Sequence, residues 1–228
     1  MKANNLRRLI NWLMGFLTRT EFRGVENIPN EGGVLIATNH MSRMDIPVLF
    51  MIPNRPEMTA LVTTKYLKHP LLRWFITTAN GIWLDRDHAD FGAFRSAVEA
   101  LEAGKAVGIA PEGTRIKTGK LVEGKPGAAL LAIRAHVPIV PVAITGTIGA
   151  FKKVLLLQRP HLTAEFGEVI PAPVLERGNR DEQLQKLTEE IMCRIAAMLP
   201  EENRGFYAEY PRVHEIIEQR RAAGISSK

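Results

Sequence analysis

A histidine and an aspartate five positions apart are the residues of this chain best suited to acid–base chemistry. His40 and Asp45 lie in the run Asn-His-Met-Ser-Arg-Met-Asp at positions 39–45. An imidazole takes up a proton near neutral pH, and a nearby carboxylate fixes its tautomer and stabilises the imidazolium that forms. Positions five apart on a regular helix point about 140° away from each other. The two side chains can therefore meet only if the backbone bends between them.

Serine hydrolases combine such a pair with a hydroxyl of the enzyme itself. In many of them that hydroxyl belongs to a serine in a Gly-x-Ser-x-Gly turn. No such turn occurs anywhere in the 228 residues. We therefore expect the attacking hydroxyl to belong to the substrate.

A second run, Pro-Glu-Gly-Thr-Arg at positions 111–115, has the composition of an anion-binding turn. Gly113 lets the backbone approach a ligand, Thr114 offers a hydroxyl, and Arg115 can grip a phosphate through two parallel hydrogen bonds. We expect Glu112 to hold that arginine in place. A surface turn with a solvated ion pair is the alternative. The loop that follows is mainly basic and carries Lys117, Lys120, Glu123 and Lys125.

Length, composition and charge narrow the setting for this chemistry. A chain of 228 residues that is 46% hydrophobic and 24% charged is large enough for one substantial core and short for two. One cysteine, Cys193, excludes an internal disulfide framework and fits a reducing compartment. The formal net charge of +6 favours anionic partners, which include nucleic acid, anionic lipid and phosphorylated small molecules.

The first twenty residues predict an amphipathic helix. Apolar residues recur at helical spacing at Leu6, Leu9, Ile10, Leu13, Met14 and Leu17, and Trp12 and Phe16 widen this face. The apolar stretch is about a dozen residues, whereas crossing a bilayer takes ~20. We therefore expect an interfacial helix over 1–20 that contacts an anionic membrane surface without spanning the membrane. A helix that merely packs on the domain is the alternative.

The rest of the chain alternates between short apolar runs and amphipathic segments, which predicts an α/β domain over 21–200 with a largely parallel sheet flanked by helices. A tail over 201–228 is expected to be helical. The predicted strands are 34–38, 58–63, 82–84, 106–110, 137–144 and 161–167. The predicted helices are one starting at 45 and those over 70–78, 91–101, 127–135 and 184–198.

Ligands of parallel sheets gather at the carboxyl ends of the strands. His40, Arg86 and the run 112–115 all follow predicted strands, so we expect these distant segments to share one cleft. Asp45 is expected to cap the helix that follows, with Pro47 in its first turn.

Four blocks of this sequence together resemble the glycerolipid acyltransferase family, with the bacterial 1-acylglycerol-3-phosphate acyltransferases as the nearest match. The blocks are Asn39-His40-x-Ser42-x-x-Asp45, Gly81-Ile82-Trp83-Leu84-Asp85-Arg86, Pro111-Glu112-Gly113-Thr114-Arg115 and Val137-Pro138-Ile139-Val140-Pro141-Val142. The resemblance extends from about Phe22 to about Gly167, and four blocks in the right order are more specific than any one of them.

The resemblance implies a reaction and a role for each matching residue. His40 would be the general base that deprotonates a free glycerol hydroxyl, and Asp45 would orient it. The oxygen would attack an acyl thioester of coenzyme A or acyl carrier protein, giving a phosphatidate, with no metal and no cofactor. The residues implied in binding the phosphate of a lysophosphatidate-like acceptor are Lys65, Arg86, Glu112, Gly113, Thr114 and Arg115. The expected location is the cytoplasmic face of the cell membrane.

Other functions remain open at the level of sequence. Related enzymes act on other lyso-lipids, including lyso-ornithine lipids, or on glycerol 3-phosphate. The triplet Asp85-Arg86-Asp87 is of the kind that holds a divalent cation with a sugar diphosphate, as in a metal-dependent glycosyltransferase. A non-enzymatic membrane-binding module would use only the basic surface and the first helix. A nucleic-acid partner is not expected, because basic residues are not interleaved with aromatic ones.

Overall fold

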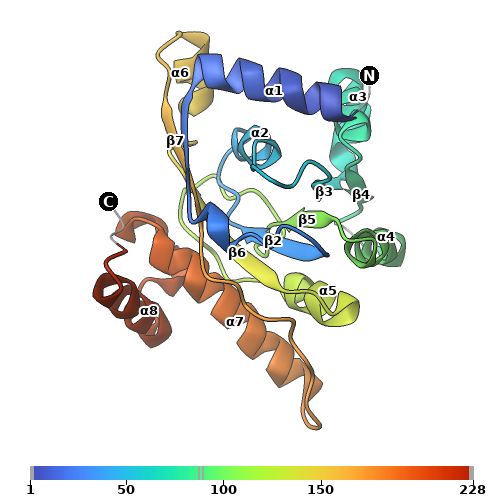
Figure 1. The fold of residues 1–228 in the computed structure, drawn as a ribbon. Helices are drawn as coiled ribbons and strands as arrows, with labels where there is room; N and C mark the ends of the chain where they lie inside the picture. The colour runs from blue at the N-terminus through green and yellow to red at the C-terminus, as the bar shows by residue number, and fades with distance from the viewer. Residues whose placement is uncertain (1–2, 87, 89, 226–228) are drawn as a thin grey trace.

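The computed structural model describes residues 3–86, 88 and 90–225. These residues form one α/β domain whose sheet has seven strands in the order β1-β7-β6-β2-β5-β3-β4, with helices on both faces (Figure 1). Strands β6, β2, β5, β3 and β4 are parallel, whereas β7 is antiparallel to β6 and pairs in parallel with β1. The strands are β1 (Arg19–Arg23), β2 (Val34–Thr38), β3 (Thr59–Thr63), β4 (Ile82–Leu84), β5 (Ala106–Ile109), β6 (Ile139–Thr145) and β7 (His161–Phe166).

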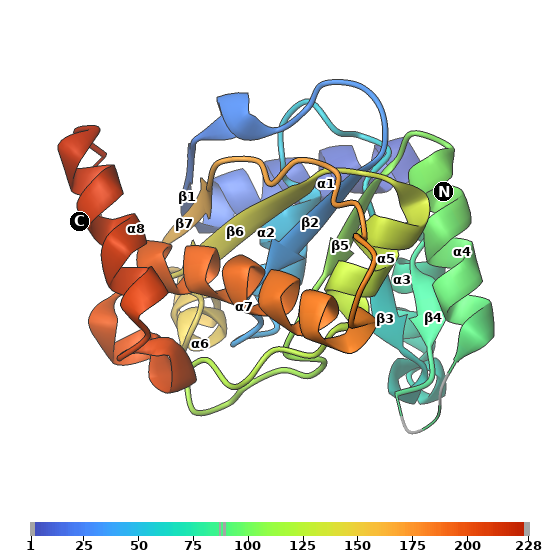
Figure 2. The ribbon, with the colours of Figure 1, turned by 90° about the horizontal axis from the view of Figure 1, so that it is seen from below.

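Two layers of helices cover the sheet. Helices α1 and α2 lie on one face and α5 and α7 on the other, with α8 beside one end of α7 (Figures 1 and 2). The helices are α1 (Ala3–Leu17), α2 (Asp45–Phe50), α3 (Pro70–Thr78), α4 (Phe91–Glu102), α5 (Gly127–Ala135), α6 (Ala150–Leu155), α7 (Arg180–Met198) and α8 (Pro211–Ala222). Short 3-10 turns are η1 (Val25–Asn27), η2 (Thr64–Lys68), η3 (Glu201–Asn203) and η4 (Gly205–Tyr207).

Strand β2 shows why this sequence forms a covered sheet. All five of its residues are buried. Leu35 and Ala37 enter the core beneath α5 and α7, and Val34 and Ile36 enter the core beneath α1 and α2. A strand covered on both faces needs a continuous apolar run, which this segment supplies.

The predicted α/β class with a largely parallel sheet is confirmed, and the helices at 70–78 and 127–135 have the predicted bounds. Two elements were not predicted. Strand β1 has the polar sequence Arg-Thr-Glu-Phe-Arg, because it lies at the edge of the sheet and is only partly buried. Helix α6 has only six residues, too few to show a helical period.

The two ends of the described chain both pack on the domain. Helix α1 buries Leu6, Ile10 and Met14 in the core that it shares with α2. Near the other end, α8 buries Val213 and Ile216 in the core around α7. In the part of the chain that the structure describes, no helix combines the length and the apolar character needed to cross a bilayer.

Candidate active site

Three neighbouring strands deliver polar side chains to the same edge of the sheet. His40 follows β2, Glu112 follows β5 and Thr147 follows β6, and the sheet order places β2 between the other two. Because these strands are parallel, their carboxyl ends lie side by side. Segments that are about seventy and a hundred positions apart in the chain therefore meet around His40.

His40 and Asp45 form a hydrogen-bonded pair. The Nδ1 atom of His40 lies 2.9 Å from Oδ2 of Asp45. The turn over 41–44 supplies the bend that brings the two together, and the same Oδ2 atom accepts the backbone N–H of Met41 at 2.9 Å and of Ser42 at 2.7 Å. The Asp45 side chain is 1% exposed and that of His40 is 17% exposed. The carboxylate is thus held inside, and part of the imidazole is open to solvent.

The prediction that Asp45 caps the following helix is wrong. Asp45 is the first residue of α2, and Met44 occupies the capping position without a side-chain hydrogen bond. The physical reason is that the carboxylate points back into the turn over 41–44, where backbone N–H groups and the imidazole take its lone pairs.

Thr147 completes the surroundings of Asp45, and the sequence reasoning missed it. Its hydroxyl donates to Oδ1 of Asp45 at 2.5 Å, and the threonine is 1% exposed. A carboxylate only accepts hydrogen bonds, so the proton shared with His40 resides on Nδ1, and Nε2 keeps its lone pair. The signal that would have found Thr147 is its place directly after a buried strand, the criterion that singled out His40.

The residue before His40 fixes the position of this turn. The side-chain amide of Asn39 donates to the carbonyl of Ile144 at 2.9 Å and accepts the N–H of Ile144 at 2.7 Å. Asn39 is fully buried. This pair of bonds joins the end of β2 to β6, and so sets the position of His40 relative to Thr147.

Glu112 lies against the backbone of His40. Its Oε2 atom accepts the N–H of His40 at 3.3 Å, and its Oε1 atom is buried with no hydrogen-bond partner among the described residues. The pKa of the Glu112 carboxyl is raised to about 8, chiefly by burial; the N–H of His40 acts to lower it, and the charge of Asp45 adds to the rise. Among the described residues no hydrogen bond or ion pair joins Glu112 to Arg115, so the expected hold on that arginine is absent.

The run 113–116 forms a tight turn beside His40. Gly113 has φ of +72°, a backbone conformation that favours glycine, and its N–H donates to the carbonyl of Ala110 at 2.9 Å. The N–H of Ile116 donates to the carbonyl of His40 at 2.8 Å. Thr114 is exposed and Arg115 is half-buried. Arg115 therefore directly precedes the residue whose N–H is bonded to the backbone of His40.

Residues of the C-terminal segment hold the basic loop that follows this turn. The carbonyl of Asn203 accepts the N–H of Leu121 at 2.9 Å, and the carbonyl of Leu121 accepts the N–H of Phe206 at 2.9 Å. The hydroxyl of Tyr207 accepts the N–H of Gly124 at 2.9 Å. The segment over 201–207, unassigned from sequence, therefore positions the loop that carries the predicted anion-binding turn.

Lys65 and Arg86 lie at the same edge of the sheet but farther along it. Lys65 follows β3 and Arg86 follows β4, and both side chains are exposed. Neighbouring strands are about 4.8 Å apart, so the ends of β3 and β4 lie about 10 and 14 Å from that of β2. The structure thus brings together His40, Asp45 and the run 112–115, and leaves the other two toward the far end of the sheet. Asp87 of the Asp-x-Asp triplet lies outside the described residues.

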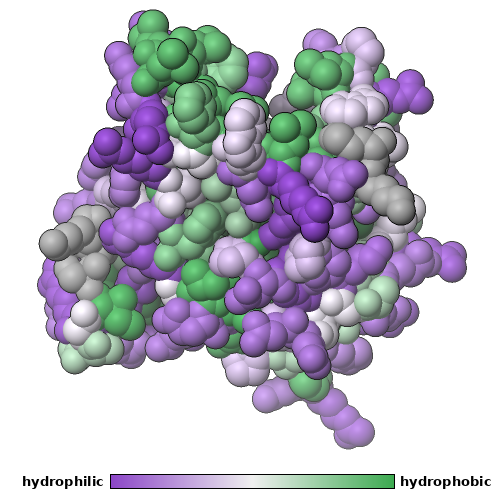
Figure 3. Space-filling model, turned by 45° about the horizontal axis from the view of Figure 1, so that its top comes forward, coloured by the Kyte–Doolittle hydropathy of each residue, from purple (hydrophilic) through white to green (hydrophobic). Residues whose placement is uncertain are grey.

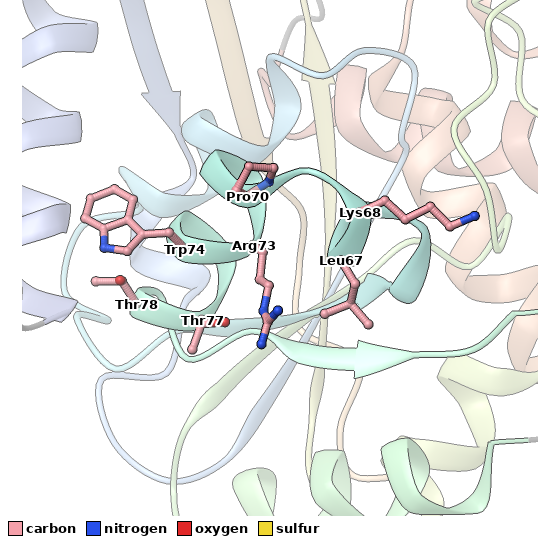
Figure 4. A pocket seen from close by; sticks show the side chains of 7 residues that line it. All are labelled: Leu67, Lys68, Pro70, Arg73, Trp74, Thr77 and Thr78. Atoms are coloured by element: carbon pink, nitrogen blue, oxygen red, sulfur yellow. The ribbon is translucent and has the colours of Figure 1, made fainter.

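A hollow of about 470 Å³ lies over η2 and α3, away from this cluster (Figure 4). The side chain of Arg73 extends between Leu67 and Thr77, while Trp74 and Lys68 point to opposite sides. None of the predicted site residues lines it. Within residues 3–86, 88 and 90–225, no three His, Cys, Asp or Glu side chains are grouped so as to hold a metal ion.

Comparison with known proteins bears on this arrangement. A family model described as Acyltransferase matches residues 19–145, which include all four sequence blocks. The 1-acyl-sn-glycerol-3-phosphate acyltransferase of Limnanthes alba is 33% identical over 156 residues, covering 67% of this chain and 53% of the relative. That of Borreliella burgdorferi is 28% identical over 144 residues, covering 62% and 56%. The chain thus spans about half the length of these curated relatives.

A solved structure has the same fold. The crystal structure of the 1-acyl-sn-glycerophosphate (LPA) acyltransferase PlsC from Thermotoga maritima aligns with a TM-score of 0.63 at 24% sequence identity. The alignment covers 83% of this chain and 76% of that one. At this identity the likeness speaks to the fold alone.

Proposed function

This chain belongs to the acyltransferase family, and from that premise we propose that it transfers an acyl group from an acyl thioester to the free hydroxyl of 1-acylglycerol 3-phosphate, forming phosphatidate. The observation that carries the proposal is the buried Asp45 carboxylate bonded to Nδ1 of a His40 whose imidazole is partly open to solvent. This pair leaves Nε2 as a base in a region that the family model matches. The titles of the relatives supply the acceptor that we propose.

The proposed step needs no nucleophile from the protein. Nε2 of His40 takes the proton of the glycerol hydroxyl as its oxygen forms a bond to the thioester carbonyl carbon. The carbon–sulfur bond then breaks, and the leaving thiolate takes the proton from the imidazolium. Asp45 stabilises that imidazolium through Nδ1. General-base catalysis contributes about 10²- to 10⁴-fold, and orientation of the hydroxyl can contribute more.

The acceptor is oriented through its phosphate, which we expect the turn over 113–115 to bind. Gly113, Thr114 and Arg115 form a turn whose next residue is bonded to the carbonyl of His40, so a phosphate held there stays near the base. A guanidinium binds phosphate through two parallel hydrogen bonds. Exposed cations at Lys65 and Arg86 extend the same edge of the sheet and would add to the attraction for an anionic acceptor.

We place the enzyme at an anionic membrane surface, with α1 in contact with lipid. Leu6 and Ile10 pack inward, whereas Trp12 and Phe16 on the opposite side are 68% and 64% exposed. Apolar side chains that face outward beside arginines suit the interface of a bilayer. The donor, coenzyme A or acyl carrier protein, and the cytoplasmic side of the membrane are parts of the same proposal.

The test is acyl transfer by the purified chain on liposomes that contain lysophosphatidate, with a labelled acyl thioester. Wild type is expected to form labelled phosphatidate with or without a chelator, and His40→Ala to lose at least about 10²-fold in rate. His136→Ala, an exposed histidine at the end of α5, is the matched control. Acyl transfer that a chelator abolishes would contradict the metal-free step. Vesicle binding without turnover favours the membrane-binding module.

The same assay selects among acceptors and donors. Lysophosphatidate is expected to exceed a lyso-ornithine lipid, because only the former offers a phosphate to Arg115. Glycerol 3-phosphate tests whether the first acyl chain is needed. Equal rates with all three acceptors would contradict the assignment of the turn over 113–115 to phosphate.

A further inference from the structure

The segment over 148–157, which contains α6, turns its large apolar side chains outward. Ala150 and Val154, four positions apart, face the core, and Ala150 is fully buried. The side chains on the other faces are 54–71% exposed: Ile148, Phe151, Leu155, Leu156 and Leu157. Figure 3 shows apolar side chains gathered at the upper left, over the position of α6 in Figure 1. Such a contiguous exposed patch marks an interaction site on a soluble domain.

The end of α1 is bonded to the residues that directly follow this segment. The Arg159 guanidinium donates to the carbonyl of Gly15 at 3.1 Å, and the N–H of Arg19 donates to the carbonyl of Pro160 at 2.9 Å. Figure 1 shows α6 and α1 at the same end of the molecule, and Figure 2 shows α6 on the side of the strands' carboxyl ends. We call the exposed apolar side chains of both elements the α1–α6 surface: Leu9, Trp12, Leu13, Phe16, Ile148, Phe151, Leu155, Leu156 and Leu157.

The two segments that carry this surface have charges of one sign only. Neither 3–20 nor 146–164 contains an aspartate or a glutamate. The basic residues of these two segments are Arg8, Arg19, Lys152, Lys153 and Arg159, together with Arg7, which turns inward to the carbonyls of Arg55 and Ile52. Basic side chains that border exposed aromatic and aliphatic ones match a bilayer interface with anionic headgroups.

The surface also adjoins the candidate active site. Thr147, whose hydroxyl binds Asp45, is followed directly by Ile148, the first exposed apolar residue of the segment. Strand β6 therefore ends at the catalytic pair and passes at once into the apolar patch. An element that enters lipid at this point brings His40 to the level of the headgroups.

We propose that α6 is a second membrane-docking element, which acts with α1 to seat the carboxyl-end edge of the sheet on an anionic bilayer. The phosphate and the free hydroxyl of a lysophospholipid lie at headgroup level, so this seating presents them to His40. Docking rests on the membrane contact of α1 proposed above and is independent of acyl transfer; only its benefit to catalysis rests on that activity.

The test is flotation of the full-length chain with vesicles of phosphatidylglycerol and phosphatidylcholine. The double variant Phe151→Ser, Leu155→Ser is expected to bind at least about tenfold more weakly, because it removes two large apolar side chains from the lipid contact. The matched control is Phe91→Ser, Val174→Ser, which removes two even more exposed apolar residues from elsewhere and should bind as wild type. Lys152→Gln, Lys153→Gln should weaken binding to these vesicles and leave binding to pure phosphatidylcholine unchanged.

A second readout locates α6 in the complex. A Phe151→Cys variant labelled with an environment-sensitive fluorophore should shift to the blue on vesicles, and the buried Cys193 is protected from the label. A label that stays in water, or a double variant that binds like the control, would overturn the proposal. If Phe151→Ser, Leu155→Ser converts a dimer into a monomer and leaves vesicle binding intact, the surface contacts a second copy of this chain and not lipid.

Activity separates this inference from the proposed function. With a short-chain, water-soluble lysophosphatidate and no vesicles, Phe151→Ser, Leu155→Ser should turn over as fast as wild type and lose rate only on vesicle-bound substrate. If the chain shows no acyl transfer but its vesicle binding depends on α6, the proposed function is contradicted and the docking proposal stands. If acyl transfer on vesicles is as fast in the double variant as in wild type, docking through α6 is contradicted and the proposed function stands.

Discussion

Two buried carboxylates contact His40, and they are held in different ways. Asp45 accepts four hydrogen bonds, from His40, Met41, Ser42 and Thr147. Glu112 accepts one, at 3.3 Å, and its other oxygen has no partner among the described residues. Hydrogen bonds stabilise an ionised carboxylate and burial without them destabilises it. The contrast teaches that one carboxylate is built to carry charge beside the imidazole, and the other to stay protonated against the backbone.

The largest effect is expected from removing the charge of Asp45. Asp45→Asn keeps the shape but offers an amide group, so the proton no longer resides on Nδ1 and the imidazolium loses its stabilising charge. We predict a fall in kcat of about 10²- to 10⁴-fold with an unchanged circular dichroism spectrum. Steady-state rates on lysophosphatidate vesicles check this. A variant within a few-fold of wild type would show that the charge of Asp45 is not used.

A smaller effect is expected at Thr147, which positions Asp45 without reaching the substrate. Thr147→Val keeps the side-chain shape and leaves Oδ1 of Asp45 without its donor, at a stability cost of about 1–3 kcal/mol. We predict a fall in kcat of about tenfold with little change in KM, because the variant loses about 1.4 kcal/mol of the free energy that orients Asp45. Thr147→Ser should restore kcat. Failure of serine to rescue would show that Thr147 acts through packing alone.

The turn over 113–115 is expected to act on acceptor binding rather than on the chemical step. Arg115→Lys keeps the charge and loses the two-pronged grip on phosphate. We predict a several-fold rise in KM for lysophosphatidate with the KM for the acyl thioester unchanged. Initial rates with each substrate varied in turn measure both. An effect confined to the thioester would move Arg115 to the donor side.

The smallest effect on activity, and the most telling on stability, is expected at Glu112. The pKa of Glu112 is about 8 in the folded protein, against an ordinary value of 4.5 for a solvated glutamate, so folding stability falls as pH rises from about 4.5 to about 8. Glu112→Gln should remove this loss, on the order of a few kcal/mol at high pH, and leave neutral-pH activity nearly unchanged. Thermal melts of both proteins across the window test it. Parallel melting curves would show that Glu112 is ionised in the folded state.

Local patterns made much of this fold predictable from sequence. The apolar run before Asn39 identifies the central strand, and the glycine after α4 and the proline at the start of α3 mark helix ends. Strand β1 escaped prediction because an edge strand with one partner needs little apolar character. Its place depends on pairing with β7, more than a hundred positions away.

The candidate site was predictable only in part, for a related reason. His40 and Asp45 were found because a short turn joins them. The bond between Thr147 and Asp45 spans 102 positions and exists because β6 happens to lie beside β2. The contact of Glu112 with the N–H of His40 likewise depends on β5 as the other neighbour. No spacing within the sequence encodes the order of strands in a sheet.

In the proposed reaction His40 activates a hydroxyl of the substrate, and no acyl-enzyme forms. Rapid mixing of the protein with an acyl thioester alone, followed by detection of free thiol, tests this most directly. We predict no burst of thiol until lysophosphatidate is added, after which thiol and phosphatidate appear together. Release of about one thiol per protein molecule before any acceptor is present would contradict it, because such a burst is the kinetic signature of a covalent intermediate.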